Sequence, residues 1–209
     1  MSYIAGKKKL RLVKYNKFIR KKINLDDDYY KRFCRKYIIY KTKEYVQEYK
    51  VFDEGDKLLF EGEYFNGKRN GKGREYYPNG ILSYEGFYKN GRVNGKGRQY
   101  YSNGNLEFEG EYFNGYKTGY GVEYFCNVKQ KLFEGEYKNG MRNGKGKEYS
   151  YYGDLEYEGE YKNGMRNGKG KLYYDSGELK FEGEFKNGMI NRKGKILYNS
   201  GEIKIWTWN

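Results

Sequence analysis

The feature that most constrains the fold is an internal repeat with a period of 24 residues. The segment EGEYKNGMRNGKGK occurs at residues 134–147 and again at 158–171. The aromatic residue before the Glu-Gly pair marks the start of each unit, and successive starts are 24, 24, 25, 24 and 24 residues apart: Phe60, Tyr84, Phe108, Phe133, Tyr157 and Phe181. A fixed period of this size is typical of solenoids and linear arrays. The sequence therefore predicts six stacked units over residues 60–204.

The first half of each unit predicts a β-strand. In LSYEGFY (residues 82–88), Leu82, Tyr84, Gly86 and Tyr88 occupy alternate positions, and successive side chains of a strand point to opposite faces. Tyr84 and Tyr88 therefore share one face, whereas Glu85 points the other way. The recurring glycine between two glutamates, such as Gly110, leaves space for a neighbouring aromatic ring to lie against the backbone.

The second half of each unit predicts a hairpin. The segment KNGRVNG (89–95) carries two Asn-Gly pairs, which favour hairpin turns because both residues tolerate positive φ. We predict a loop there, a second strand at KGRQYY (96–101) and a turn at SNG (102–104). Because each unit then adds two antiparallel strands, the predicted fold class is all-β, an elongated single-sheet antiparallel β-meander of repeated hairpins.

Composition narrows the chemistry of this array. Aromatic residues make up 20% of the chain while the mean hydropathy is −1.15, so apolar packing must rely on tyrosine and phenylalanine, which favour strands. No histidine is present, which excludes Ser-His-Asp and Cys-His catalysis and most zinc sites. Cys34 and Cys126 are far apart in sequence, and we predict that both are reduced in an intracellular chain. We expect no cofactor and no bound metal.

A family resemblance follows from these motifs. The unit YEGEYKNGMRNGKGKLYYDSGELK (157–180) resembles the MORN repeat (membrane occupation and recognition nexus), in a variant of 24 residues. In the last unit Arg192 stands where earlier units have glycine, which predicts that the array ends there. The resemblance implies an extended or arched sheet of hairpins that serves protein association, with phospholipid binding proposed for some members.

The segments outside the six units predict caps and an extension. We predict a basic tail at residues 1–24, a helix at residues 25–43, a degenerate half-repeat that caps the first unit at residues 44–59, and a C-terminal cap strand at residues 205–209. For Trp206 and Trp208 two interpretations stay open, a terminal cap or an exposed aromatic edge that pairs with a second copy. For the tail the alternatives are a solvated segment, attachment to anionic lipid, or binding of a nucleic acid or protein.

Two catalytic interpretations of the repeated motifs are disfavoured. The NGKGK segments resemble phosphate-binding glycine loops, but such a loop joins one strand to one helix, and here the motif recurs between strands. Glutamates two residues apart, as at Glu134 and Glu136, could mimic a catalytic carboxylate pair, but five copies lack the one special environment that separates two pKa values. They predict instead a solvated face with cross-strand pairing to the neighbouring lysines. We therefore predict that the chain is not an enzyme.

The remaining functional candidates are cations and the terminal tryptophans. The loop cations recur at the period of the units and are predicted to form a ridge. The candidate lipid- or partner-binding residues are Lys7, Lys8, Lys9, Arg11, Lys21, Lys22, Arg69, Lys72, Arg92, Lys96, Arg142, Lys145, Arg166 and Lys169. The candidate self-association residues are Trp206 and Trp208.

The predicted function is a non-enzymatic scaffold that docks protein partners on its aromatic sheet face, since apolar burial survives physiological salt. The alternative is an adaptor at an anionic phospholipid membrane that uses the basic tail and the loop cations. A homodimer is a further possibility through the tryptophans. Nucleic acid is the least favoured partner, because glutamates along the repeats repel phosphates. We expect a cytoplasmic protein, with a peripheral position at a membrane or cytoskeletal structure as the alternative.

Overall fold

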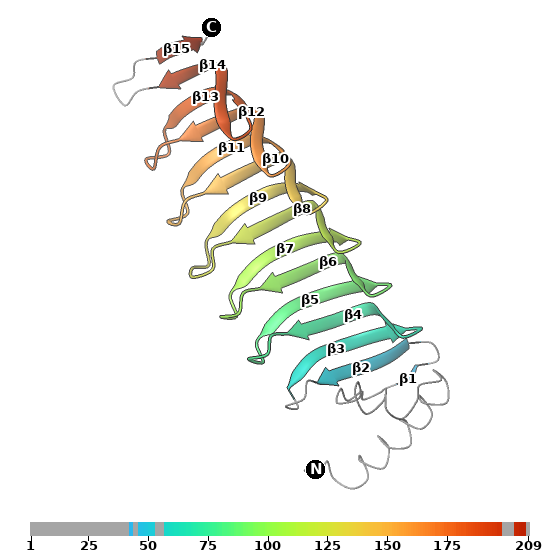
Figure 1. The fold of residues 1–209 in the computed structure, drawn as a ribbon. Helices are drawn as coiled ribbons and strands as arrows, with labels where there is room; N and C mark the ends of the chain where they lie inside the picture. The colour runs from blue at the N-terminus through green and yellow to red at the C-terminus, as the bar shows by residue number, and fades with distance from the viewer. Residues whose placement is uncertain (1–41, 44–45, 53–56, 198–202, 208–209) are drawn as a thin grey trace.

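The computed structural model describes residues 42–43, 46–52, 57–197 and 203–207, and these residues form one antiparallel sheet. Its fifteen strands follow one another in chain order (Figure 1). The described residues contain no helix, and the predicted all-β, single-sheet meander is confirmed. The first eight strands are β1 (Thr42–Lys43), β2 (Val46–Phe52), β3 (Leu58–Phe65), β4 (Lys68–Tyr76), β5 (Leu82–Lys89), β6 (Arg92–Tyr100), β7 (Leu106–Phe113) and β8 (Tyr116–Tyr124). The others are β9 (Lys131–Lys138), β10 (Met141–Tyr149), β11 (Leu155–Lys162), β12 (Met165–Tyr173), β13 (Leu179–Lys186), β14 (Met189–Leu197) and β15 (Ile203–Thr207).

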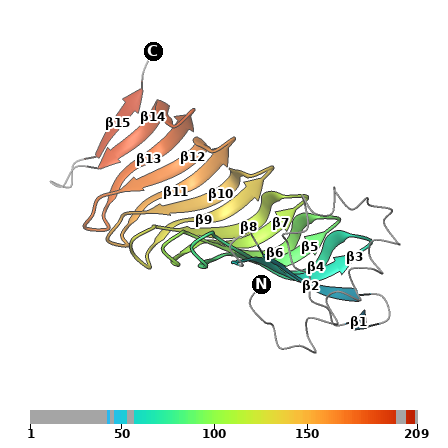
Figure 2. The same cartoon turned by 60° about the horizontal axis from the view of Figure 1, so that its bottom comes forward.

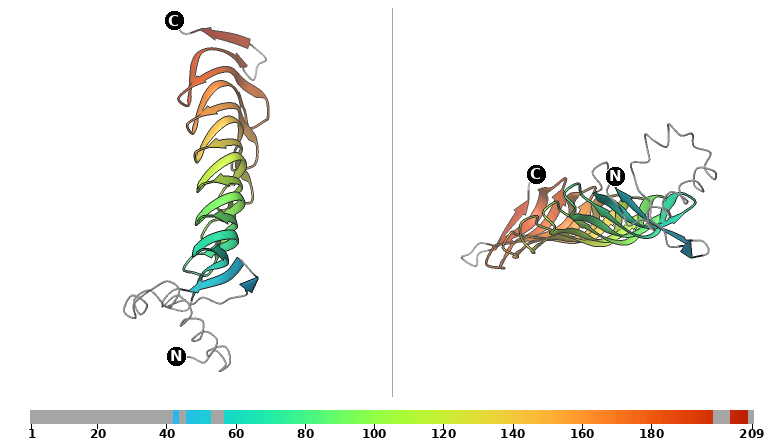
Figure 3. Two further views of the ribbon diagram at one scale, coloured as in Figure 1. Left: turned by 90° about the vertical axis from the view of Figure 1, so that its right-hand side faces the viewer. Right: turned by 90° about the horizontal axis from the view of Figure 1, so that it is seen from below.

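The sheet is a long, narrow rod. The strands lie across its long axis, with β2 and β15 near opposite ends (Figure 1). When the lower end of the rod is brought forward, the strands remain stacked in chain order, and their direction rotates along the rod (Figure 2). From the side the same strands form a narrow column (Figure 3). Right-handed strand twist accounts for this rotation. Because each strand pairs only with the strands next to it in sequence, each unit presents the same chemistry at a new position along the axis.

The hairpin turns are shorter than the sequence predicted. The turn between β5 and β6 contains only Asn90 and Gly91, which both have positive φ (52° and 87°), as a type I′ turn requires. The loop prediction over 89–95 was therefore wrong, since β6 begins at Arg92. The second Asn-Gly pair lies inside β6, where the register shifts and Gly95 has a φ of 95°. It forms a β-bulge, which accommodates extra residues without ending the strand.

The turns at the opposite edge agree with the prediction. Residues 102–104 reverse the chain between β6 and β7, and the Tyr101 N–H donates to the Asn105 carbonyl over 2.8 Å. The Tyr101 hydroxyl then donates to the Tyr124 carbonyl of the next unit over 2.9 Å. This bond fixes the position of one turn relative to the next.

The core is a continuous chain of aromatic rings on one face of the sheet. Successive rings meet edge to face with centroids 5.1–5.6 Å apart, and edge-to-face contact is a favoured arrangement of aromatic pairs. The rings alternate between the start and the end of each odd-numbered strand from β3 to β13. In spatial order they are Tyr64, Phe60, Tyr88, Tyr84, Tyr112, Phe108, Tyr137, Phe133, Tyr161, Tyr157, Phe185 and Phe181.

A row of glycines runs beneath these rings and makes their burial possible. The glycines pair across the strands from Gly62 in β3 to Gly194 in β14. A Cβ atom at Gly73 would lie 2.7 Å from Cζ of Phe60 and 3.0 Å from Cε2 of Tyr88, which is closer than carbon atoms approach. The same holds at Gly110, between Glu109 and Glu111, where a Cβ atom would lie 2.6 Å from Cζ of Phe108. The predicted role of the glycine between two glutamates, to leave space for a ring, is therefore confirmed.

The two ends of the array are described in part. β2 lies within the predicted half-repeat 44–59 and pairs with β3, with a register shift at Val51 and Phe52. Thr42 and Lys43 form β1, so the last two residues of the predicted helix 25–43 are strand instead. The rest of that helix and the basic tail 1–24 lie outside the described residues. At the C-terminal end β15 pairs with β14.

Candidate functional site: the charged face of the sheet

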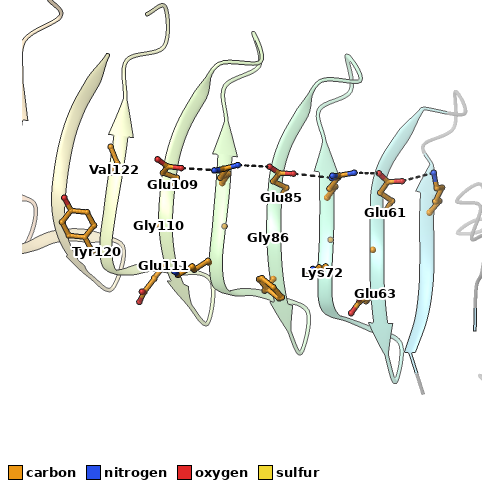
Figure 4. Close-up of a pocket in the computed structure, with 18 residues that line it drawn as sticks. Glu61, Glu63, Lys72, Glu85, Gly86, Glu109, Gly110, Glu111, Tyr120 and Val122 are labelled. Carbon is orange, nitrogen blue, oxygen red and sulfur yellow. Dashed lines mark hydrogen bonds and ion pairs between the residues drawn. The ribbon is translucent and has the colours of Figure 1, made fainter. Parts of the chain in front are cut away.

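The face opposite the rings carries charged side chains in two rows, and we name it the charged face. The two rows flank the glycine row, because the residues before and after each glycine point away from the rings. The row farther from the Asn-Gly hairpin tips is held together by ion pairs, drawn as dashed lines in Figure 4. We name it the paired row. In β2 to β7 it consists of Lys50, Glu61, Arg74, Glu85, Arg98 and Glu109.

The ion pairs of the paired row link strand to strand. Lys50 Nζ lies 2.9 Å from Glu61 Oε2, and Arg74 lies 3.7 Å from Glu61 and 3.5 Å from Glu85. Arg98 then lies 3.9 Å from Glu85 and 3.3 Å from Glu109. The chain of contacts is interrupted at β8, where an uncharged valine, Val122, occupies the next position of the row. Each pair is partly exposed and contributes little stability, but together they hold the side chains in place.

Tyrosine hydroxyls fix the glutamates of the paired row from the turn side. The Tyr76 hydroxyl donates to Glu61 over 2.7 Å. Burial, together with this bond to a carboxylate, raises the pKa of Tyr76 to about 12. Burial acts to raise the pKa of Glu61 as well, but the hydrogen bonds from Lys50 and Tyr76 outweigh it and lower that pKa. The other units repeat the bond in the pairs Tyr100–Glu85, Tyr124–Glu109, Tyr149–Glu134 and Tyr173–Glu158.

Sequence reasoning missed these tyrosines, although a signal was present. Each of them follows its glutamate by 15 residues, which is the separation across one hairpin and its return strand. A tyrosine that recurs at a fixed offset from a glutamate on the same face indicates a repeated hydrogen bond.

The second row of the charged face, which we name the open row, lies nearer the hairpin tips. Along it glutamates alternate with lysines, apart from two aromatic residues, Phe87 and Tyr120. These two side chains are 43% and 58% exposed. In order along the rod, the open row consists of Glu63, Lys72, Phe87, Lys96, Glu111, Tyr120, Glu136, Lys145, Glu160, Lys169 and Glu184.

The lysines of the open row do not form the predicted cross-strand ion pairs. Lys145 lies opposite Glu160 in register, yet in the described part of the chain its ammonium group has no carboxylate within 4.0 Å. The reason is the bulge. The Glu136 carboxylate lies over the bulge residue Gly144 and accepts a hydrogen bond from the Lys145 backbone N–H over 3.3 Å. The same absence of ion pairs holds for Lys72, Lys96 and Lys169 within the described residues.

The charged face is hollowed into a groove along the rod. One stretch of about 1190 Å³ extends from Lys50 to Val122, and a second of about 700 Å³ extends from Tyr120 to Glu184. Tyr120 borders both stretches. The glycine row forms the floor between the two rows, so backbone is accessible there between charged side chains. This arrangement can bind an elongated ligand through repeated weak contacts.

The predicted ridge of loop cations does not form. Three of the arginines lie on the face of the rings: the guanidinium carbons of Arg69, Arg142 and Arg166 lie 4.1, 4.2 and 4.5 Å from the ring centroids of Phe60, Phe133 and Tyr157. Arg92 lies at a hairpin tip and donates to the Asn114 side chain over 2.9 Å. The four lysines belong to the open row. The eight cations thus occupy three different surfaces.

The arginines of the ring face form a structural network. Arg142 lies 2.7 Å from Glu123 and 3.0 Å from Glu148, and Arg166 also contacts Glu148. Lys117 lies 2.9 Å from Glu123. Burial acts to raise the pKa of Glu123, but the bonds and charges of Arg142 and Lys117 outweigh it and lower that pKa. These cations cover the rings and neutralise carboxylates, so they are committed to the fold.

The aromatic face is also closed to partners. Eleven of its rings have at most 6% of their surface exposed, because they contact one another and several are covered by cations. The expectation that partners dock on the aromatic sheet face is therefore wrong for these rings. Exposed aromatic side chains occur instead on the charged face, at Phe87 and Tyr120, and at the edges of the rod.

Several predicted site residues lie outside the described part of the chain. These are Lys7, Lys8, Lys9, Arg11, Lys21, Lys22, Trp208 and also Cys34. The backbone of Trp206 pairs with Gly194. Cys126 is a free, exposed thiol in the turn after β8. Among the described residues, no cluster of three or more His, Cys, Asp or Glu could hold a metal ion, and no helix could span a bilayer.

The fold and this surface define a class, the single-sheet repeat proteins in which one set of side chains recurs along a rod. The family model for the MORN repeat matches residues 60–81, 108–127, 133–154, 157–178 and 181–203, and the model for the MORN repeat variant matches residues 93–114. These matches cover more than half of the chain, which therefore belongs to the MORN-repeat family. The five MORN matches start at aromatic residues that the period had marked as unit starts. No curated protein matches the chain.

Proposed function

We propose that this protein is a non-enzymatic scaffold that docks a protein partner in the groove of its charged face. MORN repeats support a repeat-based scaffold or interaction module, and an all-β repeat fold is typical of non-enzymatic modules. The observation that carries the proposal is the open row. It presents lysines without ion-pair partners among the described residues, with Phe87 and Tyr120 exposed between them.

The two rows have complementary roles in this proposal. The paired row fixes the groove wall, so little conformational entropy is lost there when a partner binds. The open row supplies charges of both signs at each unit, and repetition adds many weak contacts into a useful affinity. Because its charges alternate, the open row favours a partner of mixed charge over a uniform polyanion. An exposed aromatic ring within a polar groove supplies the apolar anchor that interfaces commonly use.

A capture experiment tests this proposal. A charged-face variant carries Lys72→Ser, Lys96→Ser, Lys145→Ser and Lys169→Ser, and a control variant of equal charge carries Lys68→Ser, Lys89→Ser, Arg92→Ser and Lys129→Ser at tips and turns. We expect proteins from a lysate of the source cells to bind the wild-type chain and the control at physiological salt, and to be lost from the charged-face variant. Equal capture by the two variants would refute the proposal.

Recruitment to an anionic membrane is the alternative function. The chain carries a formal charge of +14, and nine of its cations fall in residues 1–24. Each basic residue near an anionic leaflet contributes about 1 kcal/mol. Flotation with phosphatidylserine vesicles compares the full chain, residues 25–209 and the charged-face variant. The scaffold proposal predicts that the full chain stays unbound at physiological salt; if it floats, loss in one of the two variants identifies the tail or the open row as the lipid site.

We also propose that copies of the chain associate through the last strand. β15 is the terminal strand of the sheet among the described residues, and an unpaired strand edge favours pairing with another chain. Trp206 lies in β15, and Trp208 follows this strand in the sequence. We expect light scattering at tens of micromolar to give a mass above that of the 25.0 kDa monomer, and a Trp206→Ala, Trp208→Ala variant to return it to the monomer. Unchanged association in the variant would contradict this mode.

A further inference from the structure

The hairpin tips of the last three units carry a second exposed pattern. Each tip reads Lys-Asn-Gly-Met, and within each tip the lysine and the methionine are directly opposite in register. All six side chains are exposed, the methionines to 54%, 53% and 72%. We name this set the tip row: Lys138, Met141, Lys162, Met165, Lys186 and Met189. It alternates basic and apolar side chains along β9 to β14.

The tip row is held in a fixed geometry. The N–H groups of the tip glycines Gly140, Gly164 and Gly188 each donate over 2.9 Å to a carbonyl of the preceding unit. Because every tip is bonded to its neighbour, the spacing of the exposed side chains follows the strand spacing of about 4.8 Å. A flexible loop would not preserve such a spacing. The tips therefore present a periodic surface.

The charge of the tip row is uniformly positive. None of its three lysines has a carboxylate within 4.0 Å in the described part of the chain. The nearest glutamates along the strands, Glu136 and Glu160, lie over the bulge glycines Gly144 and Gly168. A ligand of this surface must supply negative charge for the lysines and apolar contact for the methionines. Exposed methionine is common at protein-binding surfaces because its flexible thioether adapts to a partner.

The alternation selects the conformation of the ligand. Along an α-helix, residues three and four apart fall on one stripe with a mean rise of about 5.2 Å, close to the strand spacing of about 4.8 Å. An extended peptide presents same-side residues about 6.7 Å apart, and would be out of step after two contacts. A lipid bilayer has no period and would not distinguish this alternation from any other order of the same residues.

We propose that the tip row binds an α-helix of a partner protein in which apolar and acidic residues alternate along one stripe. Apolar residues at i, i+7 and i+14 contact the methionines, and acidic residues halfway between them contact the lysines. Over six strands the two periods differ by about 2 Å, which the long lysine and methionine side chains can absorb. This proposal rests on the proposed function, a protein-docking scaffold, and adds a partner class and a second surface beside the groove.

The first three units provide an internal contrast. Their tips carry Phe65 with Lys68, Lys89 with Arg92, and Phe113 with Tyr116, so basic and apolar residues do not alternate there. The helix is therefore expected to contact the C-terminal half of the rod only.

The test uses the full chain and a designed, fluorescently labelled helical peptide with leucine at i, i+7 and i+14 and glutamate midway between them. A control peptide of the same composition places leucine and glutamate on separate stripes. We expect the control peptide to bind at least about tenfold more weakly. The tip variant Met141→Ser, Met165→Ser, Met189→Ser should lose about tenfold in affinity for the designed peptide, while the open-row variant Lys145→Ser, Lys169→Ser stays within about twofold.

Three outcomes would overturn the proposal: equal binding of the two peptides, no binding of the designed peptide at about 1 mM, or loss of binding in the open-row variant alone. Flotation of the full chain with anionic vesicles that is abolished by the three Met→Ser changes would also overturn it, since the tip row would then be a lipid site. Circular dichroism of each variant checks the sheet. The lysate capture with the charged-face variant tests the scaffold proposal independently of these results. The helix proposal can therefore fail while the scaffold proposal is supported, and the two failures are distinguishable.

Discussion

Replacing Gly73 with alanine tests how closely the rings lie on the glycine row. The new Cβ would lie 2.7 and 2.8 Å from Cζ and Cε2 of Phe60, against an ordinary carbon contact of about 3.5–4.0 Å. The Phe60 ring must therefore move by about 1 Å. The ring is fully buried, and its centroid lies 5.5 and 5.6 Å from the ring centroids of Tyr64 and Tyr88. The guanidinium carbon of Arg69 covers it at 4.1 Å from the centroid. The ring has no free direction in which to move.

The expected cost follows from this enclosure. Overpacking of a well-packed core costs about 1–3 kcal/mol, and an enclosed ring places Gly73→Ala at about 3 kcal/mol. Phe60→Leu alone should cost about 2 kcal/mol through lost ring contacts. In the double variant the shortened side chain leaves room for the new methyl group. The combined cost should therefore be about 2–3 kcal/mol, well below the sum of about 5 kcal/mol.

Urea unfolding followed by far-ultraviolet circular dichroism measures this cycle, with coincident probes to check that the array unfolds in one transition. Phe181→Leu serves as the control, because Phe181 is equally buried but nine strands from Gly73. Its effect should add to that of Gly73→Ala within about 0.5 kcal/mol. Additivity of Gly73→Ala with Phe60→Leu to the same degree would show that the ring does not occupy the space above the glycine.

Four further predictions concern the charge network, ionisation and the array. Arg142→Met should lower the free energy of unfolding by about 2 kcal/mol, because it leaves the half-buried Glu123 carboxylate short of a partner, whereas Lys145→Met should change it by less than about 0.5 kcal/mol. The pKa of Glu123 in the folded protein lies below its unfolded value of 4.5, so its contribution to stability is complete above pH 4.5 and is lost on acidification. As the pH is lowered, the melting temperature of Glu123→Gln should therefore fall less steeply than that of the wild type. Equal slopes of melting temperature against pH would count against the network. The pKa of Tyr124 is raised from 10.0 to about 12, so its contribution to stability is complete below pH 10 and is lost between pH 10 and pH 12. Over this range Tyr124→Phe should lose less stability than the wild type, as measured by unfolding at increasing pH. Deletion of residues 181–209 should lower the melting temperature, and an unchanged value would contradict stacking of units.

Local sequence patterns were sufficient to predict the sheet but not its turns. Alternation of side chains and the 24-residue period determine strands and their order. The two Asn-Gly pairs of a unit look equivalent in sequence, yet Asn90 has positive φ whereas Asn94 does not. The difference arises from register across the sheet, where Gly86 pairs with Gly97 and Tyr88 with Val93. This register is a non-local constraint, so the sequence of a single unit does not show which Asn-Gly pair forms the turn.

The wrong prediction of a single cation ridge has the same cause as the wrong prediction of the loop. Because the segment between the Asn-Gly pairs was interpreted as a loop, alternation was not applied to it. Arg142 and Lys145 are three residues apart, and in a strand an odd separation places side chains on opposite faces. The structure has this arrangement, with Arg142 over the Phe133 ring and Lys145 in the groove. Extending the period of two through the bulge would have separated the structural arginines from the open lysines.

The protein-docking role of the charged face is tested most directly by site-specific photo-crosslinking in the source cells. A photoreactive phenylalanine analogue replaces Phe87 or Tyr120 in the groove, or Tyr152 in the turn between β10 and β11. Tyr152 is a stringent control, since it is 84% exposed against 43% and 58% for the groove residues. We expect discrete protein adducts from the two groove positions and none from Tyr152. Adducts from Tyr152 with none from Phe87 or Tyr120 would contradict the assignment of the groove as the docking surface.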